Sequence, residues 1–169
     1  MDSSIELIVR SYAQSETWLS KWLDGLTQEE AAYRGTEECN NILWLLWHFT
    51  RGEDHFVNAL IQHGEEVYET GGWQQKMGSP SDRGPGYTLE QIHDFPEPKL
   101  EDLRGYHNAV REKTLAYLDS ITFEALSEVV QPDGRLPTVT AILSRSITEV
   151  ALHIGQIGYL RGIQRGINK

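Results

Sequence analysis

The chain has 169 residues, with 15 basic and 25 acidic side chains and a formal net charge of −10 at pH 7. Its length and its 39% hydrophobic content predict one globular domain over residues 1–169. The basic residues are scattered, which argues against nucleic acid and anionic membrane surfaces as partners. The sequence has neither a signal-peptide pattern nor a long apolar run, and Cys39 is its single cysteine, so we expect a reduced, cytoplasmic protein.

The first half of the chain favours helices, because all six prolines follow residue 79. Apolar residues recur at helical spacing over 5–23 and predict a first long helix. Residues 27–33 begin with a capping-box pattern that predicts a short helix. A second long helix is expected to begin at Asn40 or Asn41, which are both good N-caps, and to stop at Gly64.

Residues 64–98 are crowded with glycine and proline and read as a long irregular connection. One short helix is expected within it, capped by Thr88 and Gln91. A connection of this length in a compact domain is usually functional, and in a helix bundle it can serve as a crossover.

Two further long helices are expected over 98–120 and 138–165. Between them we predict a short helix around 124–130 and a turn at 132–134. No segment shows convincing strand alternation. Four long amphipathic helices predict an all-α fold, a four-helix bundle with an irregular crossover around residues 64–98.

The middle of the fourth helix carries a histidine and a glutamate on its apolar face. Glu149 falls about 40° from His153 around the helix and lies one turn earlier. Five residues within about 60° of His153 complete the stripe: Ile142, Ser146, Val150, Ile157 and Leu160. Because an ionised carboxylate is costly to bury alone, Glu149 needs a cation, a network of donors or a metal.

His48 in the second helix is the predicted partner of this pair. Facing helices of a bundle would bring it to Glu149 and His153, and two imidazoles with one carboxylate form a standard ligand set for Zn²⁺, Ni²⁺ or Fe²⁺. The alternative is a buried hydrogen-bonded pair, Glu149 with His153 or with His48, that holds no metal.

Three more histidines have candidate roles in the site or in the core. His55 lies two turns after His48 on nearly the same line, so it is a candidate base, a support for the ligands or a group facing the substrate. The alternative is a solvated neighbour of Asp54. His107 and His93 are expected to be core histidines whose hydrogen bonds are satisfied.

Several other chemistries lack their motifs. No HExxH pattern supports a zincin protease. A di-iron bundle needs two Glu-x-x-His motifs on long helices, and the single one, Glu90 to His93, falls in the irregular connection. Cys39 has no activating neighbour in the sequence, which disfavours a catalytic thiol.

The sequence resembles the DinB/YfiT-like superfamily of four-helix metal-binding proteins. Three segments carry the resemblance: LLWHFTRGEDHF at 45–56, LPTVTAILSRSITEVALH at 136–153 and HIGQIGYLRG at 153–162. The resemblance implies an up-down-down-up-like bundle with a long crossover, which agrees with the predicted connection.

The resemblance also implies one divalent metal ion, Zn or Ni, held between the helices. Its second-helix ligand corresponds to His48 and its last ligand to His153. The third ligand is commonly histidine in the family and is Glu149 here. This His-Glu-His set is similar to that of relatives of mycothiol-dependent maleylpyruvate isomerase, and it adds a negative charge to the site.

The function implied by the resemblance is thiol chemistry. Known activities in the family suggest a low-molecular-weight thiol S-transferase, using mycothiol, bacillithiol or glutathione, or a thiol-dependent isomerase or hydrolase. The expected partner is a small thiol or electrophile, and a homodimer is expected. The alternative function is a non-catalytic, metal-stabilised dimeric interaction bundle.

Overall fold

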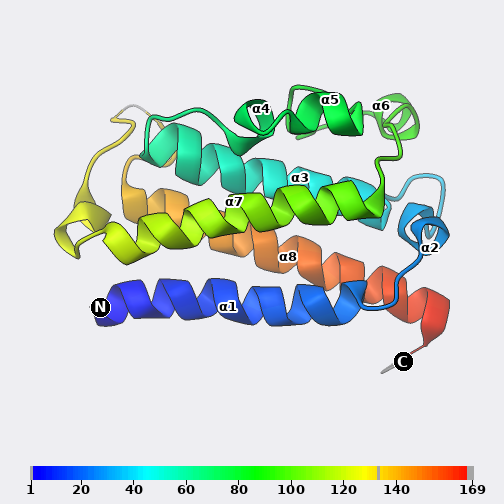
Figure 1. Ribbon diagram of the computed structural model, residues 1–169, viewed down its shortest axis with the longest axis horizontal. Helices are drawn as coiled ribbons and strands as arrows, with labels where there is room; N and C mark the ends of the chain where they lie inside the picture. The colour runs from blue at the N-terminus through cyan, green and yellow to red at the C-terminus, as the bar shows by residue number, and fades with distance from the viewer. Residues whose placement is uncertain (1, 133, 167–169) are drawn as a thin grey trace.

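The computed structural model describes residues 2–132 and 134–166. Four long helical segments lie side by side, as Figure 1 shows. They are listed here in chain order: α1 (Ser3–Leu23), α3 (Ile42–Asp54) continued by η1 (His55–Ile61), α7 (Leu100–Ser120) and α8 (Val139–Arg165). No strand occurs in these ranges, so the predicted all-α bundle is confirmed. Within the same ranges, no helix combines the length and hydropathy needed to cross a bilayer.

Side-chain caps define where the helices begin. Asp2 accepts a hydrogen bond from the backbone of Ser4 at the start of α1. Asn41, one of the two asparagines expected to do so, caps α3 by accepting from the Trp44 N–H at 2.8 Å. Thr138 caps α8 in the same way. These oxygens satisfy backbone N–H groups that have no partner inside a helix, which sets the start of each segment.

The second long helix changes its hydrogen bonding partway along. It is α-helical as far as Asp54 and π-helical in η1, where the expectation had been one regular helix. Its end agrees with the prediction: the Gly64 N–H bonds to the Asn58 carbonyl at 2.9 Å, and His63 has a left-handed φ of 53°. π-Helical segments are rare and are frequently found at functional sites.

The long connection holds more structure than predicted. The expected short helix is α6 (Leu89–His93), and its capping box joins Thr88 and Gln91. Two others, α4 (Val67–Thr70) and α5 (Trp73–Met77), were missed because four or five residues are too few to show a helical period. In Figure 1 all three lie along one edge of the bundle.

The remaining short elements follow the expected order. Helix α2 (Gln28–Ala32) has the predicted capping box. The helix expected around 124–130 is a single 3₁₀ turn, η2 (Glu124–Ser127), after which Val129 forms an isolated bridge with Thr138. The turn predicted at 132–134 includes one residue outside the described ranges.

Helix α3 is the centre of the fold. It packs against α7 and α8, and eleven of its thirteen residues are buried. A helix that is buried nearly all round needs partners for its polar side chains as well as its apolar ones. Arg111 on α7 supplies one set, since its guanidinium bonds to both oxygens of Glu53 at 2.9 and 2.8 Å and to the Tyr12 carbonyl of α1 at 3.1 Å.

His107 has the core role expected of it. It is 2% exposed and contacts Glu16 at 2.9 Å and Thr50 at 3.2 Å. The same expectation was wrong for His93, which is exposed on α6 and contacts the Glu37 carbonyl at 2.8 Å. A five-residue helix on the surface has no core face on which to place it.

We predict that Arg111→Met lowers the free energy of unfolding by about 3–5 kcal/mol, because it leaves Glu53 buried without a partner. Urea unfolding monitored by circular dichroism measures the change. The control is Arg10→Met, which removes an exposed ion pair with Glu6 and should cost about 0–1 kcal/mol. Equal losses in the two variants would contradict the prediction. Adding Glu53→Met to Arg111→Met should recover much of the stability.

Candidate metal centre

Three side chains from α3 and α8 converge as the sequence predicted. His48, Glu149 and His153 each offer a ligand atom, and these atoms lie within 4.8 Å of one another. Glu149 Oε1 is 3.4 Å from His48 Nε2 and 3.3 Å from His153 Nε2. The side chains are only 12–13% exposed, so the cluster sits at the edge of the core with a narrow access to solvent.

Local helix geometry explains two of the three positions. Glu149 and His153 are four residues apart on α8, so they project from the same face one turn apart. Ser146, Val150 and Ile157 on this helix are buried, which turns that face toward α3. His48 lies on the opposing helix at the same level, where its imidazole meets that of His153 edge-on at a centroid distance of 5.0 Å.

In each imidazole, the hydrogen-bond partner of Nδ1 determines whether Nε2 is free to bind a metal ion. His48 Nδ1 contacts the backbone carbonyl of Arg83, which can only accept, so this nitrogen carries a proton. His153 Nδ1 lies 2.6 Å from Gln156 Oε1, an amide oxygen that also accepts. In neutral rings the two Nε2 atoms are therefore unprotonated, and both lone pairs face Glu149.

Three acceptors facing one another repel unless a positive charge lies among them. Either the imidazoles gain second protons or a metal ion binds. The two separations from Glu149 Oε1 fit the metal, because the edge of a tetrahedron with bonds of about 2.0–2.1 Å is about 3.3–3.4 Å. The donor set also fits, since neutral Nε2 atoms and an ionised carboxylate suit zinc and nickel.

The carboxylate is kept ionised, as a ligand must be. Without a metal ion, hydrogen bonds donated by the Nε2–H groups of protonated His153 and His48, together with the charge of Arg145, hold the pKa of Glu149 well below its usual range, against the opposing effect of burial. Arg145 pairs with Oε2, which leaves Oε1 for the histidines. Sequence reasoning missed this arginine, although its position one turn before Glu149 was a usable signal.

Aromatic packing and a distant loop hold His48 in place. Trp44 stacks on the imidazole with centroids 4.5 Å apart and planes inclined by 14°. The Arg83 carbonyl that contacts Nδ1 precedes Gly84, which has a φ of 79°. A Cβ at Gly84 would come within 2.9 Å of Trp44 and Trp47, so only glycine lets this loop lie so close. The sequence showed a glycine-rich segment without indicating this contact.

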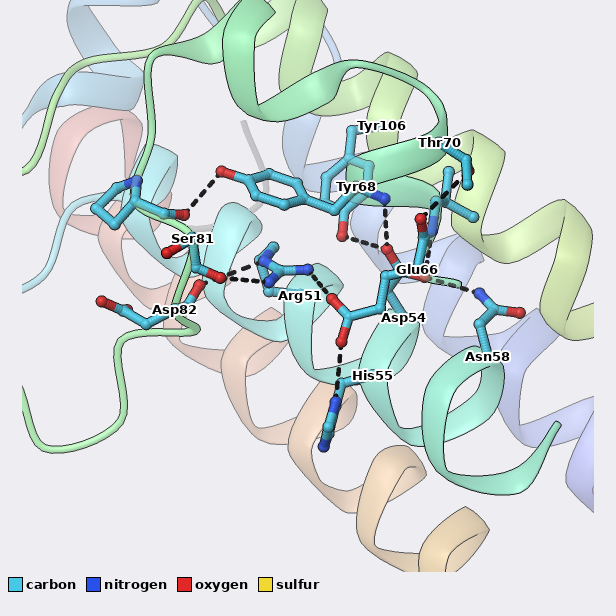
Figure 2. Close-up of polar contacts among 12 residues, drawn as sticks. Arg51, Asp54, His55, Asn58, Glu66, Tyr68, Thr70, Ser81, Asp82 and Tyr106 are labelled. Carbon is cyan, nitrogen blue, oxygen red and sulfur yellow. Dashed lines mark hydrogen bonds and ion pairs between the residues drawn. The ribbon is translucent and has the colours of Figure 1, made fainter. Parts of the chain in front are cut away.

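His55 lies outside the three-residue cluster. Its Nδ1 is 2.9 Å from Glu66 Oε1, and Glu66 also pairs with Arg51 (Figure 2). Burial raises the pKa of Glu66, but the hydrogen bond from His55 and the charge of Arg51 outweigh it, so that the pKa is lowered overall. Held in this way by a carboxylate, the ring presents its Nε2 as an acceptor.

The alternative, a solvated neighbour of Asp54, does not describe His55, because its ring contacts Glu66 and the Asp54 carboxylate is engaged elsewhere. Asp54 is fully buried and accepts from the backbone N–H groups of Val67 and Tyr68 at 2.9 Å each and from the Tyr106 hydroxyl at 2.7 Å. Figure 2 shows these contacts beside the row formed by Arg51, Glu66 and His55. Asp54 therefore anchors the start of α4, while Glu66 orients the histidine.

Cys39 is exposed in the segment between α2 and α3. Its Sγ lies 3.1 Å from the Thr36 hydroxyl, a neutral group that supplies no charge to stabilise a thiolate. This agrees with the expectation that Cys39 is not a catalytic thiol.

Comparisons with known proteins agree with the fold. A family model described as the DinB superfamily matches residues 12–157. A solved structure described as that of a conserved protein from Enterococcus faecalis has a TM-score of 0.84 and 23% sequence identity, covering 96% of this chain and 97% of its own. No curated protein matches the chain. Since the family model spans most of the sequence, the chain belongs to the DinB superfamily, whose members are often metal-binding enzymes.

Proposed function

We propose that this protein is a mononuclear divalent-metal-dependent enzyme that acts on a small thiol or electrophile. The reaction class is low-molecular-weight thiol S-transfer, or thiol-dependent isomerisation or hydrolysis. One observation supports this proposal above all: the Nε2 lone pairs of His48 and His153 both face Glu149, while the Nδ1 atoms of both rings are engaged in other contacts. Zinc or nickel is the proposed ion, held by His48, Glu149 and His153.

The chemistry supplied by the bound ion is a lowered pKa for a thiol or water, which makes a nucleophile available at neutral pH. The chain's own residues do the rest. The contact with Arg83 and the stacking of Trp44 keep His48 oriented. Arg145 offsets part of the negative charge that Glu149 brings.

His55 is proposed as a base at the edge of this site. The Nδ1–H group of His55 donates a hydrogen bond to Glu66, so Nε2 can accept a proton from a substrate. The side chain is 23% exposed, which leaves that nitrogen accessible. Arg51 holds Glu66 on the far side and thereby fixes the pair.

We also propose a cytoplasmic setting and a homodimer. The second candidate function, a metal-stabilised dimeric interaction bundle without catalysis, has one specific observation in its favour. Three large apolar side chains on α1 and α8 are exposed: Trp18 at 45%, Leu152 at 58% and Tyr159 at 72%. Exposed large apolar side chains on neighbouring helices can mark a protein interface.

Metal content gives the first test. Protein purified without chelator is expected to hold about one equivalent of zinc or nickel by mass spectrometry, and His153→Ala should lose it, because two ligands rarely retain such an ion. His93→Ala is the matched control, since His93 is exposed on α6. Chelation should also lower the melting temperature of the wild type. If neither wild type nor variant takes up metal on reconstitution, the proposed function is wrong.

A thiol should reach the ion directly. Loaded with Co²⁺, the wild type is expected to change its visible spectrum on addition of glutathione, because a sulfur ligand replaces water at an open position. S-Methylglutathione, which lacks the thiol, should have no effect. An unchanged spectrum with both compounds would favour the closed structural site of the second candidate.

The loop that holds His48 should control affinity for the ion. Gly84→Ala is expected to weaken zinc binding about 10–100-fold in a chelator competition, because the displaced Arg83 carbonyl no longer orients the imidazole. Gly86→Ala is the matched control: Gly86 has a similar φ of 73°, yet a Cβ there would meet nothing within 4 Å. Equal losses in the two variants would point to backbone strain and not to the contact with His48.

A further inference from the structure

A cavity of about 470 Å³ lies between α8, the segment 35–40 that precedes α3, and the first turn of α3, close to the candidate metal centre. Leu45 of α3 and Gln156 of α8 line it. Leu45 lies three residues before His48, and Gln156 lies three residues after His153, a distance of about 4.5 Å along each helix. Because α3 and α8 run in opposite directions, both offsets lead to the same end of this helix pair, so the cavity begins one turn from the metal ligands.

The walls of the cavity combine an apolar floor with few polar groups. Leu45 and Leu160 are 2% and 5% exposed and form buried surface, while Tyr159 stands exposed at the rim. The volume falls within the range of about 300–1,000 Å³ that is usual for sites that bind small organic molecules.

One polar atom in the wall lacks a partner. Asn40 Oδ1 is buried and receives no hydrogen bond from the residues that the structure describes. A buried acceptor left unpaired costs about 1–3 kcal/mol, so a rotation of the Asn40 side chain that brings Oδ1 to a ligand's donor in the cavity would be favoured.

Gln156 connects the cavity with the metal centre. Its Oε1 contacts His153 Nδ1 at 2.6 Å, and the same side chain forms part of the cavity wall. A molecule in the cavity therefore touches a residue that directly orients a metal ligand.

We propose that this cavity binds the apolar body of a small organic substrate, an alkyl or single-ring aryl group bearing a hydrogen-bond donor for Asn40, with its reactive end directed along α3 and α8 to His48, Glu149 and His153. The assignment rests on the proposed function, since it makes the cavity the substrate-binding part of the same site. Residues of the segment before α3 and of α8 then determine which substrates bind. The reaction takes place at the metal ligands, which lie one helical turn from the cavity.

The single cysteine of the chain allows a direct test, because Cys39 is exposed and lines the cavity. A panel of small disulfides, each carrying one fragment and a cysteamine leaving group, is equilibrated with the Co²⁺-loaded protein under mild reductant. Exchange joins the fragment to Cys39 and releases cysteamine, and intact mass gives the extent of capture. Alkyl and aryl fragments with an amide N–H should be captured at least about tenfold more than charged ones.

Two glycine variants control for the cavity. Gly35→Phe should fill it and abolish the selectivity, because Gly35 lines the cavity and a Cβ there comes no closer than 3.7 Å to Leu160. Gly162→Phe should leave capture unchanged, since a Cβ at Gly162 meets nothing within 4 Å. Gly162 lies two helical turns after Gly155 and therefore on the same face of α8, and Gly155 lines the groove between α8 and α1. Asn40→Ala should remove only the preference for the amide N–H.

The outcomes separate the two proposals. Failure of the protein to bind Co²⁺ overturns the proposed function. Binding of Co²⁺ with unselective capture, or with equal capture in wild type and Gly35→Phe, overturns the cavity assignment alone. The visible spectrum of Co²⁺ is recorded after the released cysteamine and the reductant have been removed by gel filtration. Selective capture that shifts this spectrum through Gln156 supports the assignment, whereas selective capture with an unchanged spectrum shows that the cavity does not serve the metal centre.

Discussion

The burial of α3 on nearly every side is the constraint on which the structure depends. A helix in that position can keep polar side chains only where each one meets a partner from a neighbouring element. Glu53 meets Arg111 of α7, Asp54 meets the start of α4, and His48 meets Glu149 of α8. The polar contacts of this one helix therefore determine how the rest of the chain is placed around it.

The loop at 81–84 shows how far this dependence extends. Arg51 bonds to the carbonyls of Ser81 and Asp82, at 2.8 and 3.3 Å, immediately before the Arg83 carbonyl that contacts His48. The same guanidinium pairs with Glu66, which orients His55. One buried arginine thus positions the surroundings of two histidines that lie seven residues apart. The irregular connection is part of the site and not only a link between helices.

Much of this arrangement could be predicted from the sequence, because it follows from periodicity. Four long helices produce a clear apolar stripe, and the presence of Glu149 and His153 on such a stripe was enough to single them out. Their meeting with His48 required only that two helices face each other. The contacts that support them could not be predicted. Gly84 and Glu66 act through loop conformations, which produce no repeating pattern of apolar residues in the sequence. The π-helical geometry of η1 likewise leaves no mark in the pattern of apolar residues.

The pairing of Arg145 with Glu149 has a consequence for the charge of the centre. A site with three neutral imidazoles and a divalent ion carries two positive charges. Replacing one imidazole by a carboxylate removes one of them, and the guanidinium of Arg145 restores it. Arg145 is 53% exposed, however, so its contribution is subject to screening by dissolved salt, unlike that of a buried ligand. With a divalent ion bound, the Lewis acidity of the centre would therefore depend on ionic strength through Arg145, a side chain that pairs with the ligand Glu149.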